Sequence, residues 1–185
     1  NGQLFRIENG QTTYGLNCNN DFGCLEGAWV TPWTMDPSNS NVLYAGYDAV
    51  WKSTNRGNFW NPISPVFANE KLRSLAVAPS NNNVIYTATS IQLFKTIDGG
   101  ANWFDITQGL HSNSNGPRIS YVAVDPNNPN LLYVTFSQFT PGEKVYRSTD
   151  GGNSWTNISG SLPLVPANCI MMQPDRTDAL YIGTD

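Results

Sequence analysis

Short apolar segments separated by polar turns recur along the whole chain. Between residues 74 and 106 there is an apolar segment at 74–77, a Pro/Asn turn, and three further segments at 84–89, 91–96 and 103–106. Runs of this length that are rich in β-branched and aromatic residues and bounded by turn residues predict β-strands. The pattern therefore predicts a unit of four short strands.

The turn before the fourth strand has a recognisable motif. It reads Ser-Thr-Asp-Gly-Gly-Asn-Ser-Trp at 148–155, Thr-Ile-Asp-Gly-Gly-Ala-Asn-Trp at 96–103, and Ser-Thr-Asn-Arg-Gly-Asn-Phe-Trp, an altered copy, at 53–60. Glycines supply the positive φ angles of a tight turn, Asp or Asn accepts unpaired backbone N–H groups, the first hydroxyl caps the loop, and Trp packs on the hairpin. The predicted structural positions are Ser53, Asn55, Gly57, Trp60, Thr96, Asp98, Gly100, Trp103, Ser148, Asp150, Gly152 and Trp155.

A second motif, a turn proline followed by a tyrosine strand, places Tyr44, Tyr86, Tyr133 and Tyr181 at intervals of about forty to fifty residues. This period, with four strands in each unit, is typical of an all-β fold, a β-propeller of four-stranded antiparallel blades.

We expect about four blade equivalents within residues 1–185. The predicted division is a half blade at 1–15, a loop insertion at 16–29, blades at 30–66, 67–110 and 111–160, and a half blade at 161–185. The last segment has the pattern of a first and second strand, and the first segment that of a third strand. Either the termini meet and close a four-bladed ring, or the chain is a segment of a larger propeller.

The motifs resemble those of the Asp-box (bacterial neuraminidase repeat) propellers, over residues 30–185. That group includes sialidases, xyloglucanase-type glycoside hydrolases and sortilin-like receptor domains. The stretches 31–37, 50–54 and 165–169 are most similar to the sortilin-like repeats of large secreted bacterial surface proteins. The resemblance implies a propeller fold and an extracellular or cell-surface location. It does not imply one activity, because the boxes build turns that members with unrelated functions share.

Charge and cysteine content narrow the classes of partner. The net charge is −4 and Lys and Arg form no run, which argues against a nucleic acid. No apolar stretch is long enough to predict membrane insertion. Cys18 and Cys24 bracket a polar loop and predict a disulfide, whereas Cys169 is predicted to be a buried apolar residue. Neither spacing nor histidine content fits a metal site, and no cofactor motif is present.

Strand order predicts which end of the blades carries the function. Successive turns of a meander alternate between ends, so the turns at Asp48, Ser90, Ser137 and Asp185 should share one face with the connectors between blades. Those connectors differ most from repeat to repeat, as functional loops do. Near this face we predict that Trp33, Tyr47, Asp48 and Phe139 bind a glycan or protein ligand, because aromatic rings beside polar groups recognise sugars and peptides.

The sequence thus favours an extracellular, non-catalytic binding or scaffolding module of a larger secreted or cell-surface protein. An alternative is a segment of a xyloglucanase-like glycoside hydrolase, since a catalytic aspartate in that group resembles Asp185 and, more loosely, Asp48. Such hydrolases need two carboxylates that flank the scissile bond. A second alternative is a structural repeat that assembles through the unpaired edge strands of its half blades, or pairs them with further blades of the parent chain.

Overall fold

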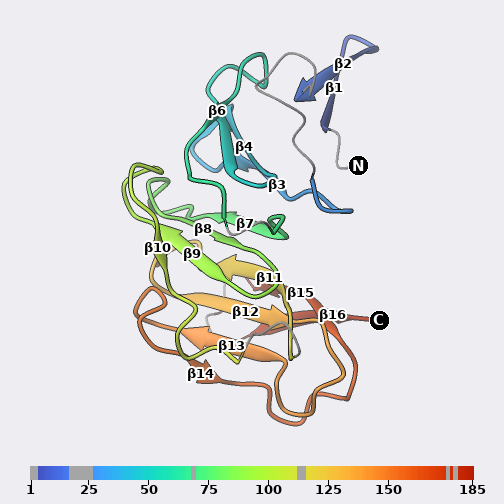
Figure 1. Ribbon diagram of the computed structural model, residues 1–185, viewed down its shortest axis with the longest axis vertical. Helices are drawn as coiled ribbons and strands as arrows, with labels where there is room; N and C mark the ends of the chain where they lie inside the picture. Colours follow the sequence, from blue (N-terminus) through green and yellow to red (C-terminus); the bar gives the residue numbers. More distant parts are fainter. Residues whose placement is uncertain (1–3, 17–26, 68–69, 112–115, 174–175, 177–178) are drawn as a thin grey trace.

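The computed structural model is built from β-strands joined by turns and loops (Figure 1). It describes residues 4–16, 27–67, 70–111, 116–173, 176 and 179–185. Within these ranges the chain forms five antiparallel sheets and no helix.

Three sheets have four strands each, paired in chain order as meanders. Their strands are β3 (Trp33–Asp36), β4 (Asn39–Gly46), β5 (Val50–Ser53) and β6 (Asn61–Pro62); β7 (Ser74–Val77), β8 (Ile85–Ala88), β9 (Leu93–Thr96) and β10 (Phe104–Asp105); and β11 (Ile119–Val124), β12 (Leu132–Phe136), β13 (Val145–Ser148) and β14 (Thr156–Asn157). The predicted all-β fold of four-stranded antiparallel blades is confirmed.

Two-stranded sheets lie at either end of this row. One pairs β1 (Leu4–Glu8) with β2 (Gln11–Leu16), and the other pairs β15 (Ala167–Met172) with β16 (Leu180–Thr184). Figure 1 shows them at opposite ends of the row, and they do not join into one sheet. The closed four-bladed ring, one of the two predicted arrangements, is therefore not formed here. The division into six segments stays a prediction, although the strands follow it apart from Leu16.

The sheets pack face to face through their apolar side chains. The first strands of neighbouring sheets, β3, β7, β11 and β15, follow one another in contact along the inner side of the row. All residues of β8 and β12 are buried, because each strand lies between two hydrogen-bonded neighbours and has another sheet against it. The tyrosines of these strands bury their rings between sheets, and the Tyr86 hydroxyl donates a hydrogen bond of 2.8 Å to the carbonyl of Pro129 in the next sheet.

Each Asp-box turn is held by the same short-range hydrogen bonds. In the third copy the Ser148 hydroxyl donates to Asp150 at 2.8 Å and accepts the Gly152 N–H at 2.8 Å, and Asp150 accepts the Ser154 N–H at 2.9 Å. The other two copies repeat this pattern around Thr96 with Asp98 and around Ser53 with Asn55. Asn thus replaces Asp without loss of the turn.

The boxes also join neighbouring sheets. The indole Nε1 of Trp155 donates to the carbonyl of Ile106 at 3.2 Å, while that of Trp60 donates within its own turn to Gly57 at 3.1 Å. A basic side chain from the preceding sheet reaches two of the boxes: Lys95 Nζ donates to Gly151 at 3.1 Å, and Arg6 Nη1 donates to the Arg56 carbonyl at 3.2 Å.

The cysteine predictions meet two different outcomes. Cys18 and Cys24 lie outside the described residues, so their disulfide stays a prediction. The prediction that Cys169 is buried is wrong: its side chain is exposed on β15, opposite Gly183 of β16, where a face of the strand is left open. In the described part of the chain, no helix has the length and apolar character needed to cross a membrane.

Candidate ligand-binding cleft

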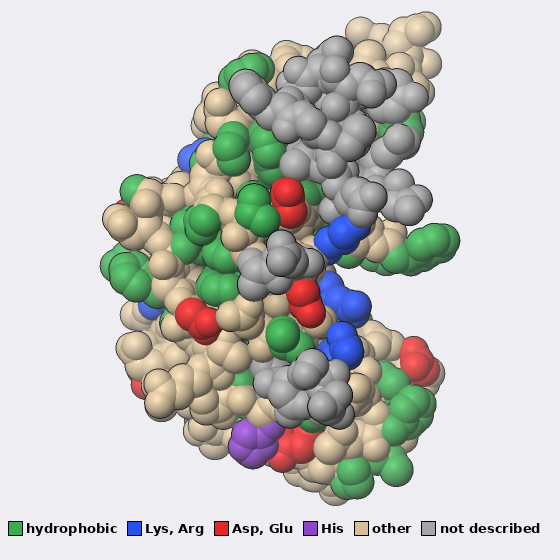
Figure 2. Space-filling model, viewed as in Figure 1, with side chains coloured by type: hydrophobic (Ala, Val, Ile, Leu, Met, Phe, Trp, Pro, Cys, Tyr) green, Lys and Arg blue, Asp and Glu red, His purple; other side chains and the backbone are tan. Residues whose placement is uncertain are grey.

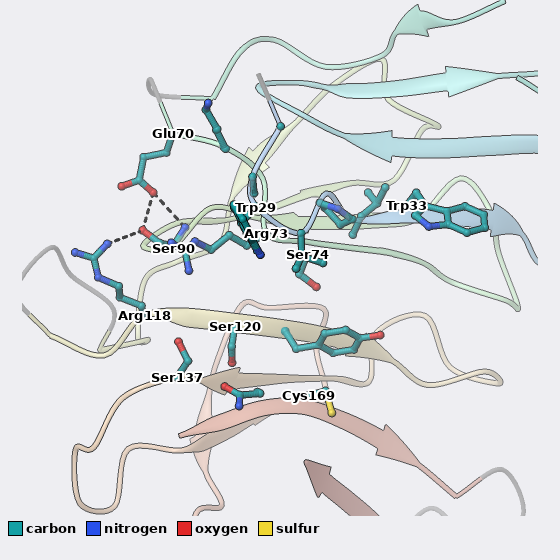
Figure 3. A pocket seen from close by; sticks show the side chains of 18 residues that line it. Trp29, Trp33, Glu70, Arg73, Ser74, Ser90, Arg118, Ser120, Ser137 and Cys169 are labelled. Carbon is teal, nitrogen blue, oxygen red and sulfur yellow. Dashed lines mark hydrogen bonds between the residues drawn. The ribbon is translucent and has the colours of Figure 1, made fainter. Parts of the chain in front are cut away.

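A cleft of about 860 Å³ lies along the inner strands of the sheets. Figure 2 shows a hollow in the molecule with Lys and Arg side chains gathered along it, and Figure 3 shows the cleft residues. Its described lining comprises Gly27, Ala28, Trp29, Val30, Pro32, Trp33, Glu70, Lys71, Arg73, Ser74, Leu75, Ser90, Arg118, Ser120, Tyr121, Ser137, Asn168 and Cys169.

Three aromatic side chains of the lining are open to solvent. Trp29 is 92% exposed and Trp33 is 56% exposed, and Tyr121 of β11 is 41% exposed. Large rings left outside the core provide flat apolar faces, and the indole N–H or phenolic OH adds a polar edge. Such rings suit the faces of sugar rings better than they suit a small ion.

The end of the cleft away from Trp33 carries charge (Figure 3). Ser90, in the turn between β8 and β9, donates hydrogen bonds to Glu70 Oε2 from its backbone N at 3.1 Å and from its hydroxyl at 2.7 Å. Arg118 Nη1 donates to the same hydroxyl at 3.3 Å. In Figure 3 these residues and Arg73 lie together, and Trp33 lies at the other end.

Hydrogen bonds between sheets hold the floor of the cleft in place. The Ser74 hydroxyl of β7 accepts the backbone N–H of Val122 in β11 at 2.9 Å. Between the next pair of sheets, the Ser120 hydroxyl of β11 donates to the Ala167 carbonyl of β15 at 2.6 Å. Because these bonds join first strands of successive sheets, the lining groups keep a defined spacing.

The structure separates the predicted ligand-binding residues. Trp33 lines the cleft, and so do the predicted turn positions Ser90 and Ser137. Phe139 is 66% exposed but lies outside the lining. Tyr47 is only 3% exposed and packs among Ala, Trp and Leu side chains, so its ring cannot meet a ligand as predicted.

Asp48 and Asp185, the carboxylates of the hydrolase alternative, lie on different sheets and outside the cleft lining. Asp48 follows β4, and its Oδ1 is buried without a hydrogen-bond partner among the described residues. Asp185 follows β16 and accepts a hydrogen bond of 2.7 Å from Asn168 Nδ2. Two sheets, β7–β10 and β11–β14, stand between them in the row (Figure 1).

The sequence interpretation missed the basic residues of the cleft. A usable signal was present, because Trp29, Lys71 and Arg118 each stand eight residues before the turn proline of their own repeat. Equivalent positions in successive repeats occupy equivalent places around a propeller. The repeat spacing therefore predicts that these three side chains lie near one another.

A second polar cluster lies away from the cleft. His111 Nδ1 is 3.1 Å from Glu143 Oε2 and 3.2 Å from the Tyr146 hydroxyl, which also donates to Glu143. Desolvation and the Glu143 carboxylate raise the pKa of Tyr146. A phenol with a raised pKa is a poor general base at neutral pH. The cluster is best explained as a link between the connector that carries His111 and the β12–β13 loop that carries Glu143.

Comparison with known proteins identifies related sequences. A probable oligoxyloglucan-reducing end-specific xyloglucanase of Neosartorya fischeri is 29% identical over 165 residues, covering 80% of this chain and 20% of that protein. A xyloglucanase of Hypocrea jecorina is 26% identical over 153 residues, covering 81% of this chain and 18% of that protein. The chain thus spans about a fifth of the length of these relatives.

Solved structures of GH74 enzymes are also similar to this chain. The Niastella koreensis GH74 enzyme is similar with a TM-score of 0.70 and 25% identity, over 83% of this chain and 25% of that one. An ancestral GH74 enzyme has a TM-score of 0.66 and 28% identity, over 82% and 21%. The family model of Sortilin-Vps10 (sortilin, neurotensin receptor 3) matches residues 48–178, which is more than half of the chain. The predicted Asp-box resemblance is confirmed, and the chain belongs to the Sortilin-Vps10 family.

Proposed function

We propose that this chain forms one wall of a polysaccharide-binding cleft in a larger extracellular β-propeller protein that acts on a xyloglucan-type polysaccharide. The observation that carries the proposal is the set of exposed rings, Trp29, Trp33 and Tyr121, along a cleft that also carries serine and basic side chains. Similarity to two xyloglucanases over about four-fifths of the chain supports it.

The shape of the cleft fits a polymer. Its aromatic end at Trp33 and its charged end at Arg118 lie apart (Figure 3), so a single sugar unit would leave one end unused. A chain of several sugars would stack on the rings and donate or accept hydrogen bonds along the serines between them.

For hydrolysis, Asp48 and Asp185 are the candidate carboxylates. The Oδ1 atom of Asp48 is buried without a hydrogen-bond partner among the described residues, and a buried polar atom of this kind calls for a functional explanation. A non-catalytic binding module remains the second candidate, since two sheets stand between the two carboxylates, whereas glycosidases need both beside one bond.

Binding is tested by titrating xyloglucan oligosaccharides into the intact protein. We expect Trp33→Ala to weaken binding about tenfold, which corresponds to about 1.4 kcal/mol. Phe139→Ala, which removes an exposed ring outside the cleft, is the matched control and should leave affinity unchanged. Equal losses in both variants, or none in either, would refute the cleft as the glycan site.

Turnover separates the two candidate functions. If the protein is a hydrolase that uses these carboxylates, Asp48→Asn and Asp185→Asn should each abolish release of reducing ends while oligosaccharide binding persists. Binding without turnover in the unaltered protein would favour the non-catalytic module. Full turnover in both variants would show that other residues carry the chemistry.

A further inference from the structure

We propose that the basic end of the cleft is a subsite for an acidic sugar unit, one that bears a carboxylate or a sulfate ester. This inference rests on the proposed glycan-binding function and adds to it the charge of the ligand. The residues concerned are Lys71, Arg73 and Arg118, with Ser90 and Glu70 as supporting groups.

The charge of the cleft opposes that of the whole chain. The protein carries ten Lys and Arg residues against fourteen Asp and Glu residues. In the described lining, three basic side chains face the single acidic side chain of Glu70. Charged groups of one sign in a cleft raise the local concentration of ligands of the other sign, so an anionic ligand is favoured here despite the negative protein.

Glu70 is already engaged in holding the site together. Its Oε2 accepts two hydrogen bonds from Ser90, and the Ser90 hydroxyl in turn accepts one from Arg118. This chain of contacts joins the connector before β7, the β8–β9 turn and the segment before β11. The guanidinium of Arg118 is therefore oriented before any ligand arrives, which lowers the ordering cost of binding.

Arg73 provides a guanidinium group that an anionic ligand can reach. Its backbone N–H donates to Ala88 at 2.7 Å, which places it beside the β8–β9 turn that carries Ser90. Its side chain is exposed, and within the described residues no hydrogen bond or ion pair is assigned to it. A guanidinium presents several donors in one plane and matches the two oxygens of a carboxylate or sulfate.

A neutral sugar would not use these groups fully. Arg and Lys only donate hydrogen bonds, and grouping them in one cleft brings a repulsion that a hydroxyl does not relieve but an anion does. The rings of Trp29 and Trp33 lie along the same cleft, so the anion is expected on a sugar rather than as a free ion.

The test uses three hexasaccharides with one backbone: cellohexaose, its C6-carboxylated derivative and its 6-sulfate. Each is titrated into the intact protein and into Arg73→Gln, Lys71→Gln and, as a matched control on β13 outside the cleft, Arg147→Gln. We expect the carboxylated or sulfated probe to bind at least tenfold more tightly than cellohexaose at low salt. This gain should fall severalfold in Arg73→Gln and Lys71→Gln, persist in Arg147→Gln, and shrink at high salt.

The two anionic probes distinguish a uronate from a sulfate ester, and a gain for either supports the subsite. Equal affinity for the neutral and acidic probes, with a loss in Trp33→Ala, would overturn this inference and leave the proposed glycan site standing. The inference would also be overturned if the acidic probes still bound more tightly than cellohexaose, by the same factor, in both Arg73→Gln and Lys71→Gln. Absence of binding by all three probes would overturn the inference, and absence of binding by xyloglucan oligosaccharides as well would overturn the proposed function.

Discussion

The indole Nε1 of Trp103 donates a hydrogen bond of 2.7 Å to the carbonyl oxygen of Ile63, forty residues earlier in the chain and in the preceding sheet. Trp103 belongs to an Asp box, and Ile63 directly follows the last strand of the sheet before it. Trp155 repeats the contact with Ile106. The box is therefore a joint between blades as well as a turn.

Removing this joint should loosen the row of sheets. Trp103→Phe keeps most of the ring but leaves the Ile63 carbonyl without its donor, which we expect to lower the free energy of unfolding by about 1–2 kcal/mol. Urea denaturation measures the loss. Phe104→Leu, at an exposed neighbouring position, should change it by less than about 0.5 kcal/mol, and a similar loss in both variants would contradict the joint.

Close approach between sheets also explains the second glycine of the box. A Cβ on Gly100 would lie 2.6 Å from the Ile63 carbonyl oxygen, and its φ is +107°. We expect Gly100→Ala to cost about 3 kcal/mol from the clash and the backbone strain together. Gly142, with φ of +70° and open space around it, is the matched control, and Gly142→Ala should cost about 1 kcal/mol. Both losses are measured by thermal or urea unfolding. Equal losses of stability in Gly100→Ala and Gly142→Ala would show that the structure relieves the clash with Ile63 at no cost.

Arg56 holds a backbone conformation that suits glycine. Its φ is +61°, where the two intact boxes have Gly99 and Gly151. We expect Arg56→Gly to be more stable than Arg56→Ala by about 1 kcal/mol, because only glycine adopts this region without strain. Both variants lose the hydrogen bond from Arg56 Nε to Asn41, so their difference isolates the backbone effect. A more stable Arg56→Ala would contradict this explanation.

Acid should weaken the two intact boxes. Hydrogen bonds from the Ser154 hydroxyl and N–H and from Ser148 lower the pKa of Asp150 to about 2, and those from Asn102 and Thr96 lower the pKa of Asp98 to about 2. A lowered folded pKa contributes stability above the unfolded pKa, near 4, and this contribution is lost as the pH falls towards 2.

Urea midpoints at pH 7, 4, 3 and 2 test this linkage. We expect a decline below pH 4 that is shallower in Asp150→Asn, since the amide keeps the acceptor oxygen and does not titrate. Asn55 already occupies the same position in the first box. An unchanged acid slope in the variant would show that Asp150 is not the group responsible.

Features that depend on neighbours in sequence were predictable. The bonds from Ser148 to Asp150 and Gly152 join residues at most four apart, and the strand at Ser74–Val77 has the bounds that its apolar pattern predicted. Alternation of apolar positions and turn residues determines these elements without help from the rest of the fold. The same reasoning predicted one face for Asp48, Ser90, Ser137 and Asp185, of which Ser90 and Ser137 line the cleft.

The functional site depended on how the sheets pack. Tyr47 has the same aromatic character as Trp33, yet one is buried against the next layer and the other is open, because only the sheet arrangement decides which strand ends are covered. Arg73 and Arg118 line one cleft, and Arg118 bonds to the Ser90 hydroxyl, because successive first strands align along the inner side of the row. The sequence by itself thus determined the repeat, its strands and its turns, through contacts a few residues long. The joints between blades and the charged cleft were decided only by the tertiary structure, because their contacts span twenty to fifty residues.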